Sequence, residues 1–329
     1  MSLQLGALER LRELPLLTVS HDVLLASYTR FGIGGPASLF CETADRQTFG
    51  TALRLLRNAC LPNVLIGGGT NLIVSDAGFD GVVLRFTGKS LTHNAMRLRV
   101  EAGASLQAVV DYSIEHGLKG METMTGIPGS LGAAVYGNAG AYGHSIQERV
   151  ERVVFSDGER DLSFGLAECE FQYRESIFKQ RKDWVILEAE LKFEAGDALA
   201  LRDKADEIRA IRDRKYPPSM KCAGSIFKNC LVADLPDGIR SKVPENVIRE
   251  GKIPSAYFLE AVGAKGLRRG DIQVATYHAN LIYNDGIGTA DDLVAVIDEL
   301  KRRVREQFGF DLQEEVQYVG FEQVTSCVM

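Results

Sequence analysis

The chain has 329 residues, of which 45% are hydrophobic and 25% charged, and its formal net charge is −6. This length favours two or three compact units over a single core. The acidic balance excludes a general nucleic-acid binder but permits a local basic pocket for a small anion, and no apolar run is long enough for a membrane span.

The amino-terminal segment and the cysteines indicate a cytoplasmic protein. Residues 1–17 carry Glu and Arg among their apolar positions, which predicts a short amphipathic helix rather than a signal peptide. Six cysteines are scattered without a CxxC pair, so reduced thiols are expected, and neither a zinc site nor a disulfide framework is predicted. No metal-ligand cluster stands out, and a monomer is the default expectation.

Residues 37–83 alternate between strand-like and helix-like patterns, which indicates a small α/β unit. The strand-like runs are SLFCE, VLIGGG and LIVSD, and the amphipathic helix is DRQTFGTALRLLRNA. Residues 81–193 are rich in strands and glycine, with one clear helix at SLQAVVDYSIEHG, and predict an α+β domain.

A charged helix, DALALRDKADEIRAIRDRKYP, follows and must end at Pro217 and Pro218, because proline lacks the amide hydrogen and fixes φ. This point is a plausible domain junction. The remainder holds a polar stretch at residues 233–256, apolar segments around AYFLEAVGAKG and HANLIYN, and the helix ADDLVAVIDELKRRVREQF.

The segment Ile66–Asn71, IGGGTN, is the first candidate for ligand binding. It lies between two strand-like runs, whereas a Rossmann GxGxxG motif needs a helix directly after the glycines to receive the pyrophosphate. A Rossmann fingerprint is therefore excluded. Two interpretations remain, a tight hairpin and a loop whose exposed amides hold a phosphate.

A second glycine-rich segment, Gly126–Gly143, has six glycines in eighteen residues. Glycine loses more backbone entropy on folding than any other residue, so this density indicates backbone that closely approaches another group or repeatedly adopts positive φ. A glycine-rich β-turn region is the alternative. Two such segments in one chain favour a phosphate-rich cofactor.

Three segments carry a family resemblance: YTRFGIGGPA, IGGGTNLIV and GIPGSLGAAVYGNAGAYG are similar to the FAD-binding elements of the UDP-N-acetylenolpyruvoylglucosamine reductases, or UDP-N-acetylmuramate dehydrogenases. The resemblance covers nearly the whole chain. It implies an α+β fold with a two-subdomain FAD-binding unit of the vanillyl-alcohol-oxidase/PCMH type and a C-terminal α+β substrate-binding domain. The expected divisions are 1–85, 86–200 and 201–329, with the C-terminal tail returning to the active site.

The resemblance implies FAD and NADPH as cofactors and a UDP-sugar as the substrate. In the family, NADPH reduces FAD and leaves, and the enolpyruvyl ether of UDP-N-acetylglucosamine then enters the same cleft and is reduced to the lactyl ether, in peptidoglycan synthesis. The residues expected to line FAD or lie close to it are Ile33, Gly34, Gly35, Gly67, Gly68, Gly69, Thr70, Asn71, Gly129, Ser130, Asn138 and Gly140.

Three further motifs resemble the family's catalytic segments. In YRESIFK, Arg174 would stabilise the enolate, a role that suits a guanidinium because it stays charged and offers several donors in one plane. In AGSIFKN, Ser225 would deliver the proton to C2 of the substrate. In LQEEV, Glu315 would orient the intermediate or relay a proton beside them. An ordinary surface ion pair is the alternative for Arg174, and a turn residue for Ser225.

Two choices in the C-terminal motifs depend on the expected local structure. Strand alternation puts Glu314 and Glu315 on opposite faces, so only one carboxylate can point inward. For His278, a hydrogen-bonded structural histidine at the start of a buried strand is favoured over an acid or base. The residues expected to contact substrate are Tyr142, Tyr173, Lys228, Asn229, Tyr257, Lys265 and Gln273.

The chain resembles the shorter subtype of the family, because the spacing from YRES to GSIFKN leaves no room for an extra tyrosine-bearing loop over the substrate. Closure over the substrate would then come from elsewhere, and residues 233–256 are a candidate. Cys230 stands where the family usually has proline, which puts the rigidity of this segment in doubt.

Two other functions remain open. One is an FAD-dependent alcohol or hydroxy-acid oxidoreductase of the same superfamily, which the C-terminal motifs disfavour. The other is a catalytically silent protein that binds a nucleotide-sugar or flavin, which the presence of Arg174, Ser225 and Glu315 together disfavours.

Overall fold

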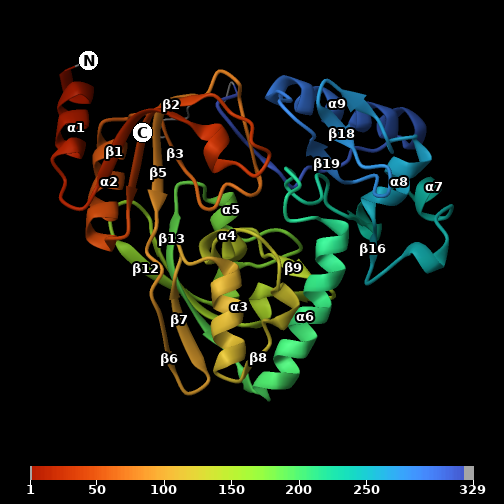
Figure 1. Ribbon diagram of the computed structural model, residues 1–329, viewed down its shortest axis with the longest axis horizontal. Coiled ribbons are helices and arrows are strands. Elements are labelled where there is room, and N and C mark those ends of the chain that lie inside the picture. The colour runs from red at the N-terminus through yellow and green to blue at the C-terminus, as the bar shows by residue number, and fades with distance from the viewer. Residues whose placement is uncertain (1, 322–329) are drawn as a thin grey trace.

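Two large hydrophobic cores organise the chain in the computed structural model, which describes residues 2–321 (Figure 1). The first core runs from Leu11 to Ala205, and the second joins Phe31, Ile33 and Ile73 to residues 226–316. Early segments of the chain therefore contribute to both cores. No helix among residues 2–321 is long and apolar enough to cross a membrane.

The first sheet has the order β1-β2-β5-β3, formed by β1 (Thr18–Leu24), β2 (Pro36–Thr43), β5 (Phe79–Phe86) and β3 (Asn63–Leu65). Strands β2 and β3 pair with β5 in parallel, as expected for an α/β unit. Helix α2 (Arg46–Asn58) begins at Asp45, whose carboxylate accepts from the Thr48 amide at 2.8 Å. It packs on this sheet, and the predicted amino-terminal helix, α1 (Ser2–Arg12), packs against it.

The second sheet is antiparallel, in the order β12-β11-β13-β7-β6. Its strands are β6 (Leu91–Asn94), β7 (Arg97–Glu101), β11 (Val150–Ser156), β12 (Asp161–Gly165) and β13 (Val185–Lys192). Helix α4 (Leu131–Tyr136) packs on β7 and β13. Helix α3 (Leu106–Glu115) packs against α4, and α6 (Ala198–Lys215) packs against α3 (Figure 1). Short elements complete this region: β8 (Leu118–Lys119), β9 (Gly140–Ala141), β10 (His144–Ser145), α5 (Ile177–Gln180) and β14 (Glu194–Ala195).

Helix α6 ends before Pro217, as the sequence predicts, but it packs with the second subdomain. Leu201 and Ala205 are buried in the first core. The division expected at residue 201 would separate these side chains from the core that buries them. We therefore propose that the C-terminal unit begins after Lys215.

The C-terminal unit combines a small antiparallel sheet with the long helix α9 (Ala290–Phe308). The sheet contains β17 (Arg268–Arg269), β18 (Ile272–Val274) and β19 (Ile282–Asn284), and α8 (Ser255–Ala261) packs against α9. The remaining elements are β15 (Cys230–Leu231), β16 (Lys252–Ile253) and α7 (Asp237–Arg240).

The polar stretch 233–256 folds over the second core, to which it contributes Leu235, Val243 and Ile253. Near its end, the Glu250 carboxylate lies 3.2 Å from where a Cβ on Gly143 would be, so the stretch reaches the second glycine-rich segment. Its role in closing over a substrate stays a prediction.

The chain finally returns to the first subdomain. Strand β20 (Gln317–Val319) pairs in parallel with β4 (Leu72–Val74), and this pair forms its own two-stranded sheet. Strands β3 and β4 therefore belong to different sheets. The hairpin interpretation of IGGGTN is wrong, because the two strands that flank this loop do not pair with each other.

Candidate active site where the three units meet

The two glycine-rich segments face each other across a gap too narrow for side chains. A Cβ on Gly68 would lie 3.0 Å from the Cα of Gly129, and one on Gly67 would lie 2.9 Å from the Ser130 hydroxyl. The Thr70 hydroxyl also donates to the Pro128 carbonyl at 3.3 Å. The result is a cradle of main-chain atoms, as binding a phosphate through loop amides requires.

The second segment contains a helix that the sequence analysis missed. Helix α4 begins at Ser130, whose hydroxyl accepts from the Ala133 amide at 3.3 Å. Gly132 lies on this helix, and a Cβ there would come within 2.9 Å of the Ala102 side chain. The serine cap was the available signal, but glycine density disfavours a helix when close packing is not known.

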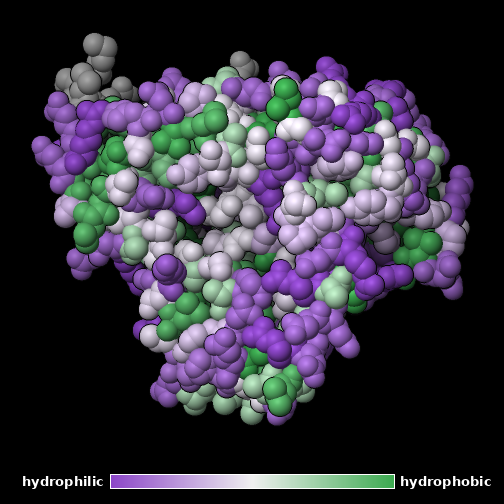
Figure 2. All heavy atoms as spheres, in the orientation of Figure 1, coloured by the Kyte–Doolittle hydropathy of each residue, from purple (hydrophilic) through white to green (hydrophobic). Residues whose placement is uncertain are grey.

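A cavity of about 290 Å³ opens beside the cradle. Figure 2 shows this face of the molecule hollowed near its middle. The residues that line the cavity are Ser27, Tyr28, Thr29, Arg30, Gly67, Gly68 and Arg85. Two guanidinium groups and glycine backbone fit a dinucleotide pyrophosphate, so the residues present are suited to FAD. Ser27–Arg30 and Arg85 were not among the residues expected from the sequence to lie at the cofactor, although YTR belongs to one of the motifs that carry the resemblance.

Ile33, Gly34 and Gly35 lie next to this cavity in sequence but do not line it. Ile33 is buried in the second core, and Gly34, at φ +137°, packs against the Val74 side chain. A Cβ on Gly35 would collide with the Asp76 carbonyl. The carbonyls of Gly34 and Gly35 accept from Ala26 and Leu25, so these glycines position the segment that lines the cavity.

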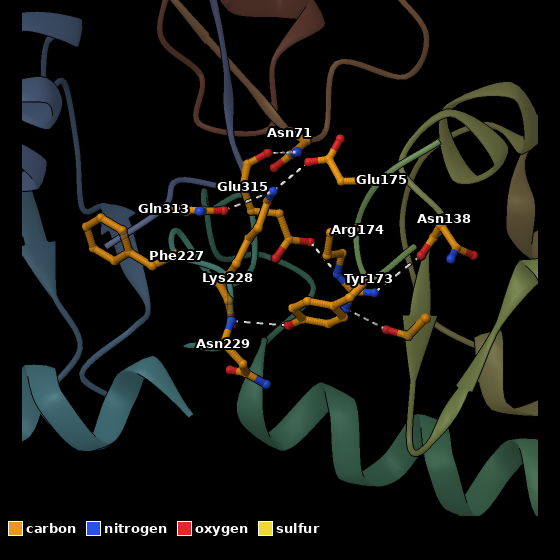
Figure 3. Close-up of polar contacts among 12 residues, drawn as sticks. Asn71, Asn138, Tyr173, Arg174, Glu175, Phe227, Lys228, Asn229, Gln313 and Glu315 are labelled. Carbon is orange, nitrogen blue, oxygen red and sulfur yellow. Dashed lines mark hydrogen bonds and ion pairs between the residues drawn. The ribbon is translucent and has the colours of Figure 1, made fainter. Parts of the chain in front are cut away.

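Arg174 is held at three points. Its Nη2 donates to the Gly140 carbonyl at 2.8 Å, and its Nη1 donates to the Asn138 carbonyl at 3.4 Å (Figure 3). Its Nε lies 2.8 Å from Oε1 of Glu315, but the N–H is not aligned for a hydrogen bond. The backbone of Arg174 is left-handed, at φ +59°. These contacts fix the guanidinium between the second glycine segment and the segment just before β20.

The side chain of Asn138 is fully occupied inside the protein. It is 3% exposed, and its Nδ2 donates to Gln147 Oε1 at 3.1 Å and to the Gln172 carbonyl at 2.8 Å. These bonds hold Asn138 in place, and its carbonyl in turn accepts from Arg174. A contact between Asn138 and a cofactor stays a prediction.

The neighbouring Glu314 and Glu315 point to opposite sides, as strand alternation predicts. Glu314 pairs with Lys301 at 2.6 Å, whereas Glu315 faces Arg174. The Asn71 side chain donates to the Glu315 carbonyl at 2.8 Å, which links the first glycine loop to the C-terminal segment (Figure 3).

The residue after Ser225, Ile226, joins the Ser225 segment to Glu315. The Glu315 amide donates to the Ile226 carbonyl at 2.7 Å, and Ser225 forms a bridge with Leu281. Among residues 2–321, the hydrogen bond recorded for its hydroxyl is with Tyr216, at 3.3 Å. The structure therefore gathers Arg174, Glu315 and the Ser225 segment at one junction, while their catalytic roles stay predictions.

A cluster of charges that the sequence analysis missed joins the second subdomain to the C-terminal unit. Oε1 of Glu175 accepts from Lys228 at 2.6 Å and from Lys179 at 3.0 Å (Figure 3). Burial alone would raise the pKa of Glu175, but hydrogen bonds from both lysines outweigh it and lower this pKa. Both lysine side chains are 13% exposed. Lys228, an expected substrate contact, is thus already paired.

Tyr173 and Asn229 also meet across this boundary. The Tyr173 hydroxyl accepts from the backbone amide of Asn229 at 3.1 Å, and burial raises the pKa of Tyr173.

Two further positions differ in exposure. Tyr142 is half exposed, with φ +54°. The thiol of Cys230 has its pKa raised to about 12 by burial, and β15 holds this residue by pairing with β16. The segment is therefore anchored without the proline.

The other expected substrate residues lie within the C-terminal unit. The Tyr257 ring packs edge-on against Phe258, Lys265 pairs with Glu260 at 3.0 Å, and Gln273 accepts from Tyr283 at 2.9 Å. None of their recorded contacts within residues 2–321 reaches Arg174, Ser225 or Glu315.

His278 has the features of a structural histidine. Burial, with the nearby Lys215 charge, lowers its pKa to about 4, so the ring is neutral near pH 7. Its Nδ1 accepts from the Asn280 amide at 3.2 Å. The structure agrees with the structural alternative for this residue.

Comparison with known proteins adds two family matches and several full-length relatives. Residues 37–159 match an FAD binding domain, and residues 216–319 match the UDP-N-acetylenolpyruvoylglucosamine reductase C-terminal domain. The second match begins directly after α6. The chain is 58% identical to the UDP-N-acetylenolpyruvoylglucosamine reductase of Solibacter usitatus over 94% of this chain and 100% of that protein. It is 36% identical to the reductase of that name from Rubrobacter xylanophilus, over 96% and 98% of the two chains.

A solved structure shows the same architecture. The crystal structure of UDP-N-acetylenolpyruvylglucosamine reductase from Thermus caldophilus superposes with a TM-score of 0.72 at 29% identity, over 92% of this chain and 99% of that one. Together with the two domain matches, this confirms the predicted fold class of an FAD-binding unit followed by a C-terminal α+β domain.

Proposed function

The chain belongs to the UDP-N-acetylenolpyruvoylglucosamine reductase family, and from this premise we propose that it reduces UDP-N-acetylglucosamine enolpyruvate to UDP-N-acetylmuramate with FAD and NADPH. The observation that carries the proposal is the junction at which Arg174, Glu315 and the Ser225 segment meet beside the glycine cradle. The chemistry that FAD supplies when bound is hydride transfer, first from NADPH and then to C3 of the substrate.

Arg174 stabilises the negative charge that develops on the enolate during reduction. A guanidinium keeps its charge at all relevant pH values and presents its donors in a fixed plane. Because carbonyls of Asn138 and Gly140 and the carboxylate of Glu315 already orient it, little reorganisation is needed when the charge appears. Glu315 holds the guanidinium in this orientation.

Ser225 supplies the proton to C2 of the substrate. A serine hydroxyl is a weak acid, so its contribution depends on its position more than on its acidity. The backbone bond between Glu315 and Ile226 supports this role, because it places the Ser225 segment in register with the Arg174–Glu315 pair.

Hydrogen bonds join the Gly67–Thr70 loop, expected to bind FAD, to the segment that carries Glu315. Asn71 follows Gly67–Thr70 directly, and its side chain and carbonyl bond the backbone of Glu315 and Gln317. Binding of FAD at the loop would therefore order the segment that carries Glu315, directly before β20. The expected cofactor contacts that line the cavity, Gly67 and Gly68, support the same arrangement.

An anaerobic half-reaction experiment tests the proposal. The purified yellow protein is reduced with NADPH, UDP-N-acetylglucosamine enolpyruvate is added, and the return of oxidised-flavin absorbance is followed together with formation of the lactyl ether. Rapid return with product is the expected result. A protein that is reduced but ignores this substrate would favour the alcohol or hydroxy-acid alternative, and substrate binding without flavin reoxidation would favour the silent binding protein.

The cytoplasmic location, the monomeric state and the preference for NADPH over NADH are parts of the same proposal. Size-exclusion chromatography with light scattering tests the monomer. Flavin reduction rates measured with each nicotinamide cofactor test the preference.

A further inference from the structure

Tyr216 ends helix α6 at the point where the chain turns into the C-terminal unit. Its amide donates to the Arg212 carbonyl at 2.7 Å, and Pro217 and Pro218 follow directly. Its hydroxyl lies 3.3 Å from the hydroxyl of Ser225. The tyrosine is outside the motifs that carry the family resemblance.

The contact between the two hydroxyl groups is supported from both sides. The Tyr216 ring packs on a small hydrophobic cluster that contains Cys222, Ala275 and Leu281. Ser225 forms a backbone bridge with the same Leu281. The cluster therefore packs against the Tyr216 ring and also contains the residue that bridges the Ser225 backbone.

Two cations flank the Tyr216 ring. The Lys215 ammonium lies 5.0 Å and the Arg212 guanidinium carbon 5.6 Å from its centroid. These cation–π contacts help to hold the ring in place beside the turn. A phenol is a far stronger acid than an aliphatic hydroxyl, so proton transfer from Tyr216 to a serine alkoxide is downhill.

We propose that Tyr216 is a positioning residue for Ser225 that also returns its proton, an inference that rests on the proposed function. Tyr216 donates to the Ser225 oxygen, which leaves the Ser225 hydrogen free to point at the substrate. When the Ser225 O–H bond breaks and the C2–H bond forms, the Tyr216 proton moves to the serine oxygen. Water then reprotonates the tyrosinate.

The test uses Tyr216→Phe in the FAD-loaded enzyme, with Tyr277→Phe as a matched control. Tyr277 donates to the Lys215 carbonyl at 3.0 Å, so this control also loses a phenolic hydroxyl next to the same turn. For Tyr216→Phe we expect flavin reduction by NADPH within twofold of wild type and flavin reoxidation by the enolpyruvyl substrate slowed about tenfold to a hundredfold. Substrate affinity, read from the perturbed flavin spectrum, and the thermal midpoint stay unchanged.

Two further measurements separate proton handling from a structural effect. The solvent deuterium isotope effect on reoxidation increases in Tyr216→Phe, and Tyr216→His, which keeps a ring with an N–H donor, recovers part of the rate. Wild-type reoxidation in Tyr216→Phe, equal slowing of both half-reactions, or the same defect in Tyr277→Phe overturns the inference.

Ser225→Ala distinguishes this inference from the proposed function. If reoxidation slows in Ser225→Ala but not in Tyr216→Phe, the relay is wrong and the proposed reduction stands. If wild type itself fails to be reoxidised by the substrate, the proposed function is wrong.

Discussion

Replacing Glu175 by Gln removes the single carboxylate that Lys179 and Lys228 share, and we expect it to destabilise the protein by about 2 kcal/mol. Hydrogen bonds to charged groups contribute about 1.5–3 kcal/mol each. The loss is smaller than the sum of two such bonds, because Gln keeps a neutral acceptor. Each lysine also keeps a second acceptor, the Arg174 carbonyl at 2.9 Å for Lys179 and Gln313 Oε1 at 3.5 Å for Lys228.

The expected change in melting temperature follows from the chain length. An unfolding entropy of about 2.1 cal/mol/K per residue over 329 residues gives about 0.7 kcal/mol/K, so 2 kcal/mol corresponds to about 3 °C. Differential scanning calorimetry at pH 7.5 measures this shift. Glu306→Gln serves as the matched control, because Glu306 pairs with Arg302 at the surface, and it should leave the melting temperature unchanged.

The pH dependence gives a second, independent check. The folded protein lowers the pKa of Glu175 from its ordinary value of 4.5, so the stabilisation is fully present above that value and is lost as the pH falls below it. The gap between wild type and Glu175→Gln should therefore shrink toward pH 3.5. A variant as stable as Glu306→Gln at pH 7.5, or a gap that persists unchanged at pH 3.5, would refute the reasoning.

Three more predictions follow from the site. Gly68→Ala should weaken FAD retention about tenfold, because the added Cβ would lie 3.0 Å from the Cα of Gly129. Gly238→Ala is the control and should keep its flavin, because a Cβ there meets nothing within 4 Å. The ratio of flavin to protein absorbance after gel filtration measures both variants. Arg174→Lys should lower kcat/KM by about a hundredfold, because an ammonium cannot reach two carbonyls and a carboxylate in one plane. A kcat/KM within threefold of wild type in steady-state kinetics would contradict this. His278, with its pKa lowered to about 4, should show no titration of its ring resonance between pH 5.5 and 8 by NMR, and a midpoint in that range would contradict the structural assignment.

Local patterns in the sequence predicted most of the regular elements. Helix α2 begins at Asp45 and α3 at Ser105, each capped by its own side chain, and α6 ends where Pro217 forbids continuation. The alternation expected of an extended segment also separated Glu314 from Glu315, which lie just before β20. These features depend on neighbours a few positions apart, which a single sequence displays directly.

The errors and omissions have a common cause. IGGGTN was compatible with a hairpin until β4 was found paired with β20 instead of β3. Helix α4 was missed because its one glycine, Gly132, is needed for close packing against Ala102, about thirty positions earlier in the chain. In each case the deciding partner is distant in sequence and leaves no periodic trace.

The sequence by itself determined most of the regular elements, the end of α6 before Pro217, the two glycine segments and the motifs that resemble the family. The family resemblance also implied that Glu315 lies beside Arg174. Only the tertiary structure showed two contacts that no motif implied, Glu175 with Lys228 and Tyr216 with Ser225. Helix and strand periodicity arises from backbone geometry within a few residues and is therefore visible in one chain. Contacts between units depend on how completed elements pack, so their chemistry becomes apparent only after the chain has folded.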